Sequence, residues 1–211
     1  LLSASTIWSW SSGHESMCGS ISLLAGSRKQ EIKDNLQRMI QASRNYTEYQ
    51  FVIAGAPGIS PEFYQAYMGD DTKIIFGQTY SLLSHATAAL VTSGTATLET
   101  ALFRVPQVVC YYTAAGKLVS FLRRHILKVK YISLVNLIAG REVVAELVAD
   151  GMTAENVKQQ LEAILPGQMT REQMLQNYDA LIKILGQEGA SERAAGKIVE
   201  LLSQKYNRSL Q

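Results

Sequence analysis

The sequence has little of what marks a secreted, membrane-spanning or metal-binding protein. Only two cysteines occur among its 211 residues, Cys18 and Cys110, which are too few for a disulfide framework and have no partners at metal-ligand spacing. No run approaches the roughly 20 apolar residues that a membrane-spanning helix needs. No Lys or Arg precedes Arg28, so the basic start of a signal peptide is lacking. We therefore expect a reducing compartment and no membrane-spanning helix.

Acidic residues are absent from 104–141, although this stretch holds seven Lys or Arg. Because the whole chain has a net charge of only +2, the remaining residues are net acidic. A local excess of one sign suggests a surface that meets an anionic partner. Hydrophobic residues make up 47% of the chain and charged residues 18%, which excludes an intrinsically disordered chain and a coiled coil.

Short apolar runs alternate with amphipathic stretches after a serine-rich tail over residues 1–20. The runs lie at 21–26, 50–55, 72–76, 88–94, 106–112 and, more weakly, 131–135. Between the first two runs, Ile32, Leu36 and Met39 recur at helical spacing and predict one buried helix face. Further helices are predicted at 61–69, 95–104 and 114–127. Buried runs separated by helices predict an α/β fold, a Rossmann-like doubly wound parallel sheet.

Helices alone are predicted beyond Gly140, at 142–149, 153–165, 171–185 and 191–206. Thr153 followed by Asn156 is typical of a helix N-cap. We therefore divide the chain into an irregular tail (1–20), a Rossmann-like domain (21–150) and a C-terminal helical annex (151–211). The annex packs either on the same domain or on a second copy of the chain, as a homodimer.

Candidate ligand-binding residues follow the predicted strands, because ligands of an open parallel sheet bind beyond the carboxyl ends of its strands. Arg28, in GSR after the first run, could clamp a diphosphate, or it could be a surface arginine. SGTATLE follows the fourth run, where a glycine and a helix N-terminus could receive a phosphate. In that segment Glu99 shares a helix face with Thr95 and could accept hydrogen bonds from ribose. The alternative is a capped turn with a solvated Glu99.

Two further features leave alternatives open. Asn136 is a polar residue within an apolar run, so its amide could contact either a ligand or the backbone of a turn. The stretch AAGKLVSFLRRHILKVKY could lie on an anionic membrane through its basic residues, Lys117, Arg123, Arg124 and Lys128. It could equally be a core-packed helix with a solvated basic face. Nucleic acid is disfavoured as a partner, because no aromatic residues are interleaved as stacking platforms.

The motifs LLAGSRKQEI, LVTSGTATLETAL, PQVVCYY and KYISLVNLIAGREVVAEL occur in this order along the chain. Together they resemble the C-terminal half of the lipid-A-disaccharide synthase family, from about Ile21 to Tyr206. SGTATLE alone is shared by several glycosyltransferases, whereas SLVNLIAGRE is specific. The resemblance implies an inverting glycosyltransferase of the GT-B fold and a UDP-sugar-binding domain over 21–150.

The resemblance also implies a reaction and a site. The family transfers 2,3-diacylglucosamine from UDP-2,3-diacylglucosamine to 2,3-diacylglucosamine 1-phosphate (lipid X), at the cytoplasmic face of the Gram-negative inner membrane. Arg28 and Asn136 match its catalytic arginine and asparagine. The positions that match its UDP-binding residues are Ser93, Gly94, Thr95, Glu99 and Tyr111. No metal or other cofactor is implied, because Arg28 and helix N-termini would stabilise the leaving diphosphate.

The sequence departs from the family pattern in two ways. Tyr112 stands where some relatives have arginine. The N-terminal acceptor-binding half, with its proposed general base, has no counterpart in the sequence, so we expect this chain alone to bind nucleotide without transferring sugar. The alternatives are another UDP-sugar GT-B enzyme, such as a peptidoglycan glycosyltransferase or an epimerase, and a non-catalytic nucleotide-binding remnant.

Overall fold

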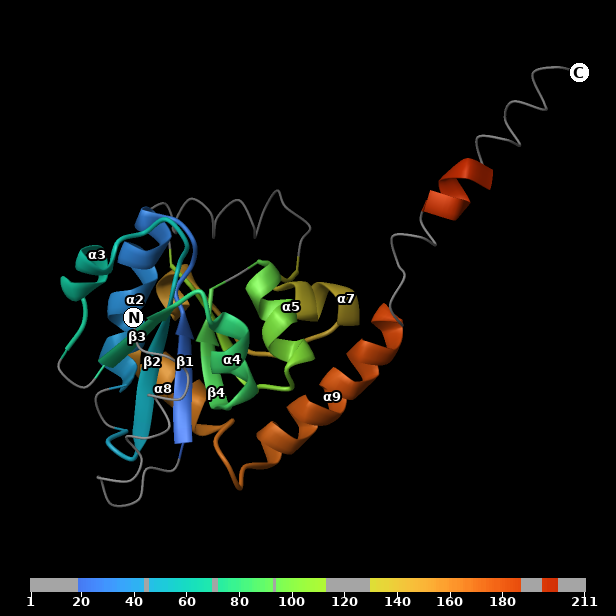
Figure 1. The fold of residues 1–211 in the computed structure, drawn as a ribbon. Helices are drawn as coiled ribbons and strands as arrows, with labels where there is room; N and C mark the ends of the chain where they lie inside the picture. The colour runs from blue at the N-terminus through green and yellow to red at the C-terminus, as the bar shows by residue number, and fades with distance from the viewer. Residues whose placement is uncertain are drawn as a thin grey trace, which may run out of the picture.

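A six-stranded parallel sheet forms the centre of the molecule (Figure 1). The computed structural model describes residues 19–43, 46–69, 72–92, 94–112, 130–186 and 195–200. The strands are β1 (Gly19–Leu24), β2 (Tyr49–Gly55), β3 (Thr72–Phe76), β4 (Ala86–Val91), β5 (Gln107–Tyr111) and β6 (Glu146–Val148). They pair in the order β3-β2-β1-β4-β5-β6, every pair parallel. The predicted doubly wound α/β fold is confirmed.

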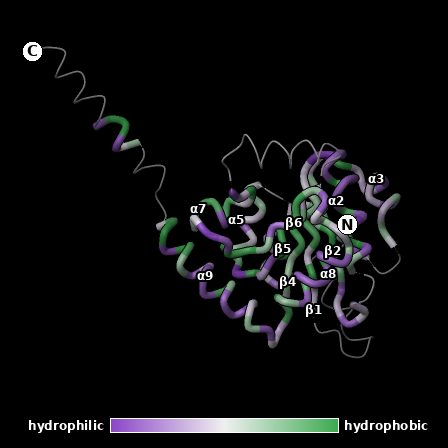
Figure 2. The backbone as a smooth tube through the Cα atoms, turned by 180° about the vertical axis from the view of Figure 1, so that it is seen from behind, coloured by the Kyte–Doolittle hydropathy of each residue, from purple (hydrophilic) through white to green (hydrophobic). Residues whose placement is uncertain are grey.

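Helices cover both faces of this sheet. They are α2 (Lys29–Ser43), α3 (Pro61–Gln65), α4 (Thr79–Ser84), α5 (Thr95–Leu102), α7 (Leu134–Ala139), α8 (Ala154–Glu162) and α9 (Met169–Leu185), with a 3-10 turn at Ala149–Gly151. Helices α2 and α8 pack together, while α7 and α9 pack beside α5. In Figure 2 the strands are largely hydrophobic and enclosed by helices that carry hydrophilic stretches.

Alternate residues of β1 enter two different hydrophobic clusters, one on each face of the sheet. The sheet therefore forms the middle of three layers, with helices on either side. Ile21 and Leu23 are fully buried in the larger cluster, with Leu36 of α2 and Leu161 of α8. Leu24 is buried in a smaller cluster on the other face, which also contains Leu83 of α4. Because successive strand residues point to opposite faces, a strand buried on both faces is mostly apolar, as the continuous runs predicted; β1 departs from this at Ser20 and Ser22, which are also buried.

Three local predictions are wrong. The run 131–135 is not a strand: Ser133 Oγ accepts the Asn136 N–H at 3.2 Å and caps α7, so the chain turns helical there. The sixth strand, β6, lies within 142–149, which was predicted to be helical. It is a three-residue edge strand, half-buried throughout and therefore without a buried run to reveal it. Strand β1 also begins at Gly19, inside the stretch assigned to the tail.

The predicted cap of α8 is confirmed, since Thr153 Oγ1 accepts the Asn156 N–H at 3.1 Å. Replacing Thr153 with alanine leaves that N–H without its partner, so we expect a loss of about 0.5–2 kcal/mol in the free energy of unfolding. Urea denaturation of the two proteins measures this loss. Thr153→Ser keeps the hydroxyl and should remain within a few tenths of a kcal/mol of the original chain; equal losses for both variants would contradict the capping role.

Candidate functional site

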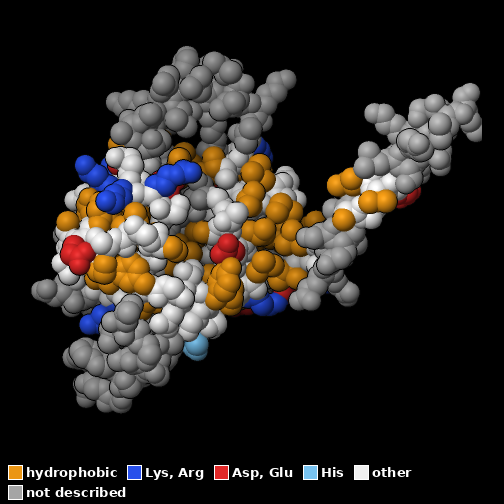
Figure 3. All heavy atoms as spheres, turned by 45° about the horizontal axis from the view of Figure 1, so that its top comes forward, with side chains coloured by type: hydrophobic (Ala, Val, Ile, Leu, Met, Phe, Trp, Pro, Cys, Tyr) orange, Lys and Arg blue, Asp and Glu red, His pale blue; other side chains and the backbone are white. Residues whose placement is uncertain are grey.

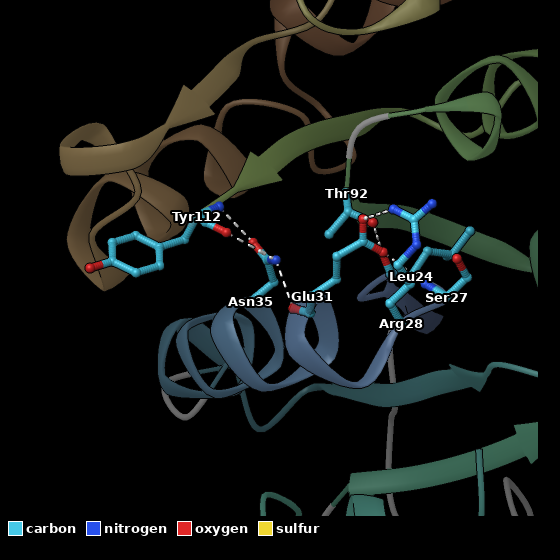
Figure 4. A network of polar contacts seen from close by, with 7 residues as sticks. All are labelled: Leu24, Ser27, Arg28, Glu31, Asn35, Thr92 and Tyr112. Carbon is cyan, nitrogen blue, oxygen red and sulfur yellow. Dashed lines mark hydrogen bonds and ion pairs between the residues drawn. The ribbon is translucent and has the colours of Figure 1, made fainter. Parts of the chain in front are cut away.

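The order of the sheet reverses at β1, which lies between β2 and β4. In doubly wound sheets a crevice opens at this point beyond the carboxyl ends of the strands, and ligands bind there. The backbone N–H and the hydroxyl of Thr92 both donate to the Leu24 carbonyl oxygen, at 2.9 and 3.1 Å (Figure 4). These bonds hold the end of β4 against the end of β1. The GSR and SGTATLE segments therefore leave the sheet side by side.

Arg28 lies at this edge with its side chain 81% exposed. Its Nη1 is 3.5 Å from Glu31 Oε1, and Glu31 Oε2 accepts the Ser27 N–H at 3.2 Å (Figure 4). Gly26 has φ of +113°, and a Cβ there would approach Glu31 Oε2 to 2.8 Å. Glu31 thus folds back against a loop that requires glycine and holds Arg28 loosely. An exposed guanidinium with one long ionic contact retains donors for an anionic ligand.

The second segment begins at Gly94, which precedes the first residue of α5. Its φ of 112° and ψ of −157° are accessible essentially to glycine alone. Thr97 donates both its N–H, at 3.3 Å, and its hydroxyl, at 2.8 Å, to the Gly94 carbonyl oxygen. Thr95 is exposed at the start of the helix, and Glu99 is half-buried one turn later. A helix N-terminus that is open to solvent at this edge can accept an anion.

Replacing Gly94 with alanine tests the backbone requirement. A Cβ at Gly94 meets nothing within 4 Å, so the expected loss of about 1–3 kcal/mol in the free energy of unfolding comes from backbone strain alone. Chemical denaturation measures it. The matched control is Gly151→Ala, because Gly151 also faces open space but has no positive φ. A control that loses as much stability as Gly94→Ala would refute the strain argument.

The end of β5 brings two tyrosines to the same edge. Both Tyr111 and Tyr112 are half-buried. Asn35 of α2, itself fully buried, accepts the Tyr112 N–H at 2.7 Å and donates to the Glu31 carbonyl oxygen at 2.7 Å (Figure 4). The Arg38 guanidinium lies 3.5 Å from the centroid of the Tyr112 ring. Helix α2 thus fixes the end of β5, and it brings the Arg38 guanidinium onto the Tyr112 ring.

Asn136 is fully buried, and its amide is occupied by protein groups. The Nδ2 donates to the Val144 carbonyl oxygen and to Glu146 Oε1, both at 2.8 Å. The Oδ1 accepts the N–H groups of Val143 and Val144, at 2.7 and 3.0 Å. The sequence left two alternatives for this amide, a ligand or the backbone of a turn. The bonds to Val143 and Val144 agree with the second. The catalytic role that the resemblance implies for Asn136 stays a prediction.

Several predicted site residues lie outside the described residues: Ser93, Lys117, Arg123, Arg124 and Lys128.

Cys110 is completely buried as expected of a small apolar residue, and this burial raises the pKa of its thiol. Within the described ranges, no three His, Cys, Asp or Glu residues are grouped so as to hold a metal ion. None of the helices in those ranges is both long and apolar enough to cross a membrane.

Three residues at or near the site were not predicted: Glu31, Asn35 and Glu146. Asn35 had a signal, because it lies three residues after Ile32 on the stripe predicted to be buried. The sequence signal for Glu31 was weaker: it is an acidic residue in the first turn of a helix. The sequence carried no signal for Glu146, because its segment was predicted to be a helix.

Basic side chains gather over the α2 and α3 side of the molecule in Figure 3, where the edge described above comes forward.

Comparison with known proteins agrees with the motifs. The sequence profile of the family described as lipid-A-disaccharide synthetase matches residues 14–199. The lipid-A-disaccharide synthase of Myxococcus xanthus is 35% identical over 190 residues, which are 86% of this chain and 49% of that protein. The chain therefore spans about half the length of the curated relatives it matches.

Solved structures agree on the fold. The calicheamicin glycosyltransferase CalG4 superposes with a TM-score of 0.55 and 18% identity, over 89% of this chain and 43% of that one. The Staphylococcus aureus protein MnaA, in a co-structure with UDP, superposes with a TM-score of 0.54 and 17% sequence identity, over 88% of this chain and 46% of that one. These likenesses assign the GT-B fold, with one of its two halves covered. Given the profile match over 14–199 and the ordered motifs, the chain belongs to the lipid-A-disaccharide synthetase family.

Proposed function

We propose that this chain is the donor-binding half of a lipid-A-disaccharide synthase and binds the UDP part of UDP-2,3-diacylglucosamine. The observation that carries the proposal is the meeting of GSR and SGTATLE at the point where the sheet order reverses, joined by the bonds from Thr92 to Leu24. UDP presents two chemistries, an anionic diphosphate and a ribose with two hydroxyls. The edge offers a matching group for each.

In this proposal Arg28 and the N-terminus of α5 receive the diphosphate. The guanidinium is exposed, and Gly94 and Thr95 leave the helix N–H groups open to an anion. Glu99 would accept the ribose hydroxyls, and Tyr111 would flank the nucleotide from the end of β5. Ser93, which precedes Gly94 in the sequence, belongs to the proposed set. MnaA, which shares the fold, was solved in a co-structure with UDP, and this supports a nucleotide as the ligand.

The same groups would assist an inverting transfer. When an acceptor hydroxyl attacks the anomeric carbon of the donor sugar, the bond from that carbon to the diphosphate breaks and the electron pair leaves on UDP. Arg28 and the α5 N-terminus would stabilise this charge, with no metal needed. The proton of the acceptor, lipid X, would pass to a base on the other half of the enzyme, which has no counterpart in this chain.

The experiment supplies that other half. We propose mixing the chain with the N-terminal half of the Myxococcus xanthus enzyme, UDP-2,3-diacylglucosamine and lipid X, and following lipid A disaccharide 1-phosphate by mass spectrometry. Product should form only when both halves are present. Product from the chain alone would contradict the division of labour. Two folded halves that associate, bind their substrates and form no product would favour a non-catalytic remnant.

We also propose where the protein acts. The basic residues Lys117, Arg123, Arg124 and Lys128 would hold it on the anionic inner face of the inner membrane, near substrates that carry acyl chains.

The division into a UDP-sugar-binding unit over 21–150 and a helical unit over 151–211 is likewise a proposal. The contacts of α8 with α2 and of α9 with α5 support packing of the helical unit on the same domain. A homodimer, in which the C-terminal helices pack on a second copy of the chain, is the alternative.

A further inference from the structure

Asn136 has no hydrogen-bonding capacity left for a ligand. A side-chain amide has two N–H donors and one oxygen that accepts about two hydrogen bonds. Both donors are used, by the Val144 carbonyl oxygen and by Glu146 Oε1, and the oxygen accepts the N–H groups of Val143 and Val144. The side chain is also fully buried. Direct contact between this amide and a sugar nucleotide would require four bonds to be broken or shared.

Glu146 connects Asn136 to the chain that enters α7. Besides the Asn136 amide, its carboxylate accepts the N–H groups of Ile132 and Ser133, at 2.9 and 3.0 Å, and the Ser133 hydroxyl at 2.8 Å. The same hydroxyl oxygen accepts the Asn136 N–H and caps α7. Ser133, Asn136 and Glu146 form what we call the Asn136 network. Hydrogen bonds to a carboxylate are stronger than those between neutral groups, so the network holds α7 firmly on β6.

The two elements that the network joins each lie against part of the proposed nucleotide site. Helix α7 packs on α5, which carries Thr95 and Glu99 (Figure 1). Strand β6 pairs with β5 in a register that places Val148 beside Tyr111. A change in the angle between α7 and β6 would therefore be passed to the elements packed on them, α5 and α9 on one side and the end of β5 on the other. Ser133 and Asn136 of the network are fully buried, so these two side chains are not part of a surface that a ligand can reach.

From this arrangement we infer that Asn136 and Glu146 are positioning residues, which keep α5 and the end of β5 in the geometry that receives the nucleotide. Their effect on binding rests on the proposed function, whereas their effect on the order of α5 does not. Asn136 then acts through Glu146 and the 143–144 backbone, and its loss resembles the loss of Glu146. A residue that touched the nucleotide itself would not share its effect with a carboxylate on β6.

The test uses a cycle of variants of the full chain: Asn136→Ala, Glu146→Ala and the double variant. We expect each single change to raise the dissociation constant for UDP by about 3- to 30-fold, and the double variant to do little more than either single one. Hydrogen–deuterium exchange without nucleotide should rise over 94–102 and 107–112 and stay unchanged over 49–55 and 72–76. Ser133→Ala weakens the network with both other side chains in place, so it gives a milder form of the same changes if a larger substitution fails to fold.

Asn156→Ala is the matched control. Asn156 also donates to a backbone carbonyl oxygen, that of Gly151 at 2.9 Å, but it lies at the start of α8. This variant should leave both the UDP affinity and the exchange of α5 unchanged. The inference is overturned if Glu146→Ala and Ser133→Ala keep the original affinity and α5 exchange while Asn136→Ala loses affinity, since Asn136 would then contact UDP itself. If the original chain bound no UDP but α5 exchange rose as expected, the proposed function would fail and the positioning role would stand.

Discussion

Replacing Arg28 with alanine should weaken UDP binding by about 1.5–3 kcal/mol, which is the usual value of a hydrogen bond to a charged group and corresponds to a loss of roughly 10- to 150-fold in affinity. The melting temperature should hardly change, because the side chain is 81% exposed and its ionic contact with Glu31 is 3.5 Å long. Isothermal titration calorimetry and thermal denaturation measure the two quantities. A large effect on binding with none on stability is the signature of a ligand contact.

Lys33→Ala provides the control for Arg28. Lys33 is also basic and exposed, and it lies on α2, which begins directly after Arg28, more than one turn further along the chain. Removing its charge should change UDP affinity far less than Arg28→Ala, because the interaction of exposed charges is screened over about 8–10 Å at physiological salt. If the two variants lost the same affinity, the effect would be one of overall charge, and Arg28 would have no specific contact with the diphosphate.

Neutralising the four basic residues Lys117, Arg123, Arg124 and Lys128 with glutamine should nearly abolish binding to anionic vesicles at low salt. Each basic residue near such a surface contributes about 1 kcal/mol, so the combined loss is of order 4 kcal/mol. Cosedimentation with vesicles of phosphatidylglycerol and phosphatidylethanolamine measures it. UDP affinity should stay unchanged, since none of the four residues belongs to the proposed nucleotide site.

The control for the membrane prediction removes the same charge elsewhere, from Lys33, Lys158, Lys183 and Lys197. This variant should retain most of the vesicle binding, because the proposed membrane contact depends on where the charges lie. Equal losses for the two variants would mean that net charge alone drives adsorption. Unchanged cosedimentation of the first variant would exclude a membrane role for these residues and favour the alternative of a solvated basic face.

The sheet and the place of the candidate site on it could be predicted from the sequence, because both depend on buried strands. Within the runs 50–55 and 88–94, the stretches 51–55 and 88–91 have no polar side chain, as is typical of a strand covered on both faces. Once the strands were known to be parallel, their carboxyl ends had to meet at one edge, so Arg28 and Gly94 were expected to lie near each other. The bonds from Thr92 to Leu24 confirm that their segments do.

The contacts of the asparagines could not be predicted in this way. Asn35 meets Tyr112, which lies 77 residues away in the sequence, and that pairing exists only after α2 has packed on the sheet. Asn136 could be identified as a polar residue in an apolar run, but its partner Glu146 lies on an edge strand of three residues that carries no pattern of its own. Long-range packing, rather than local periodicity, decides both contacts.

The central claim, that this chain is a donor-binding half, is tested most directly by titrating the unmodified chain with UDP in a calorimeter, with ADP as the comparison. The account predicts binding of one UDP per chain, clearly tighter than that of ADP, and weakened roughly 10- to 150-fold by Arg28→Ala. A chain that is folded by circular dichroism and yet binds neither nucleotide, or binds both equally, would contradict the claim that the edge between β1 and β4 is a UDP site.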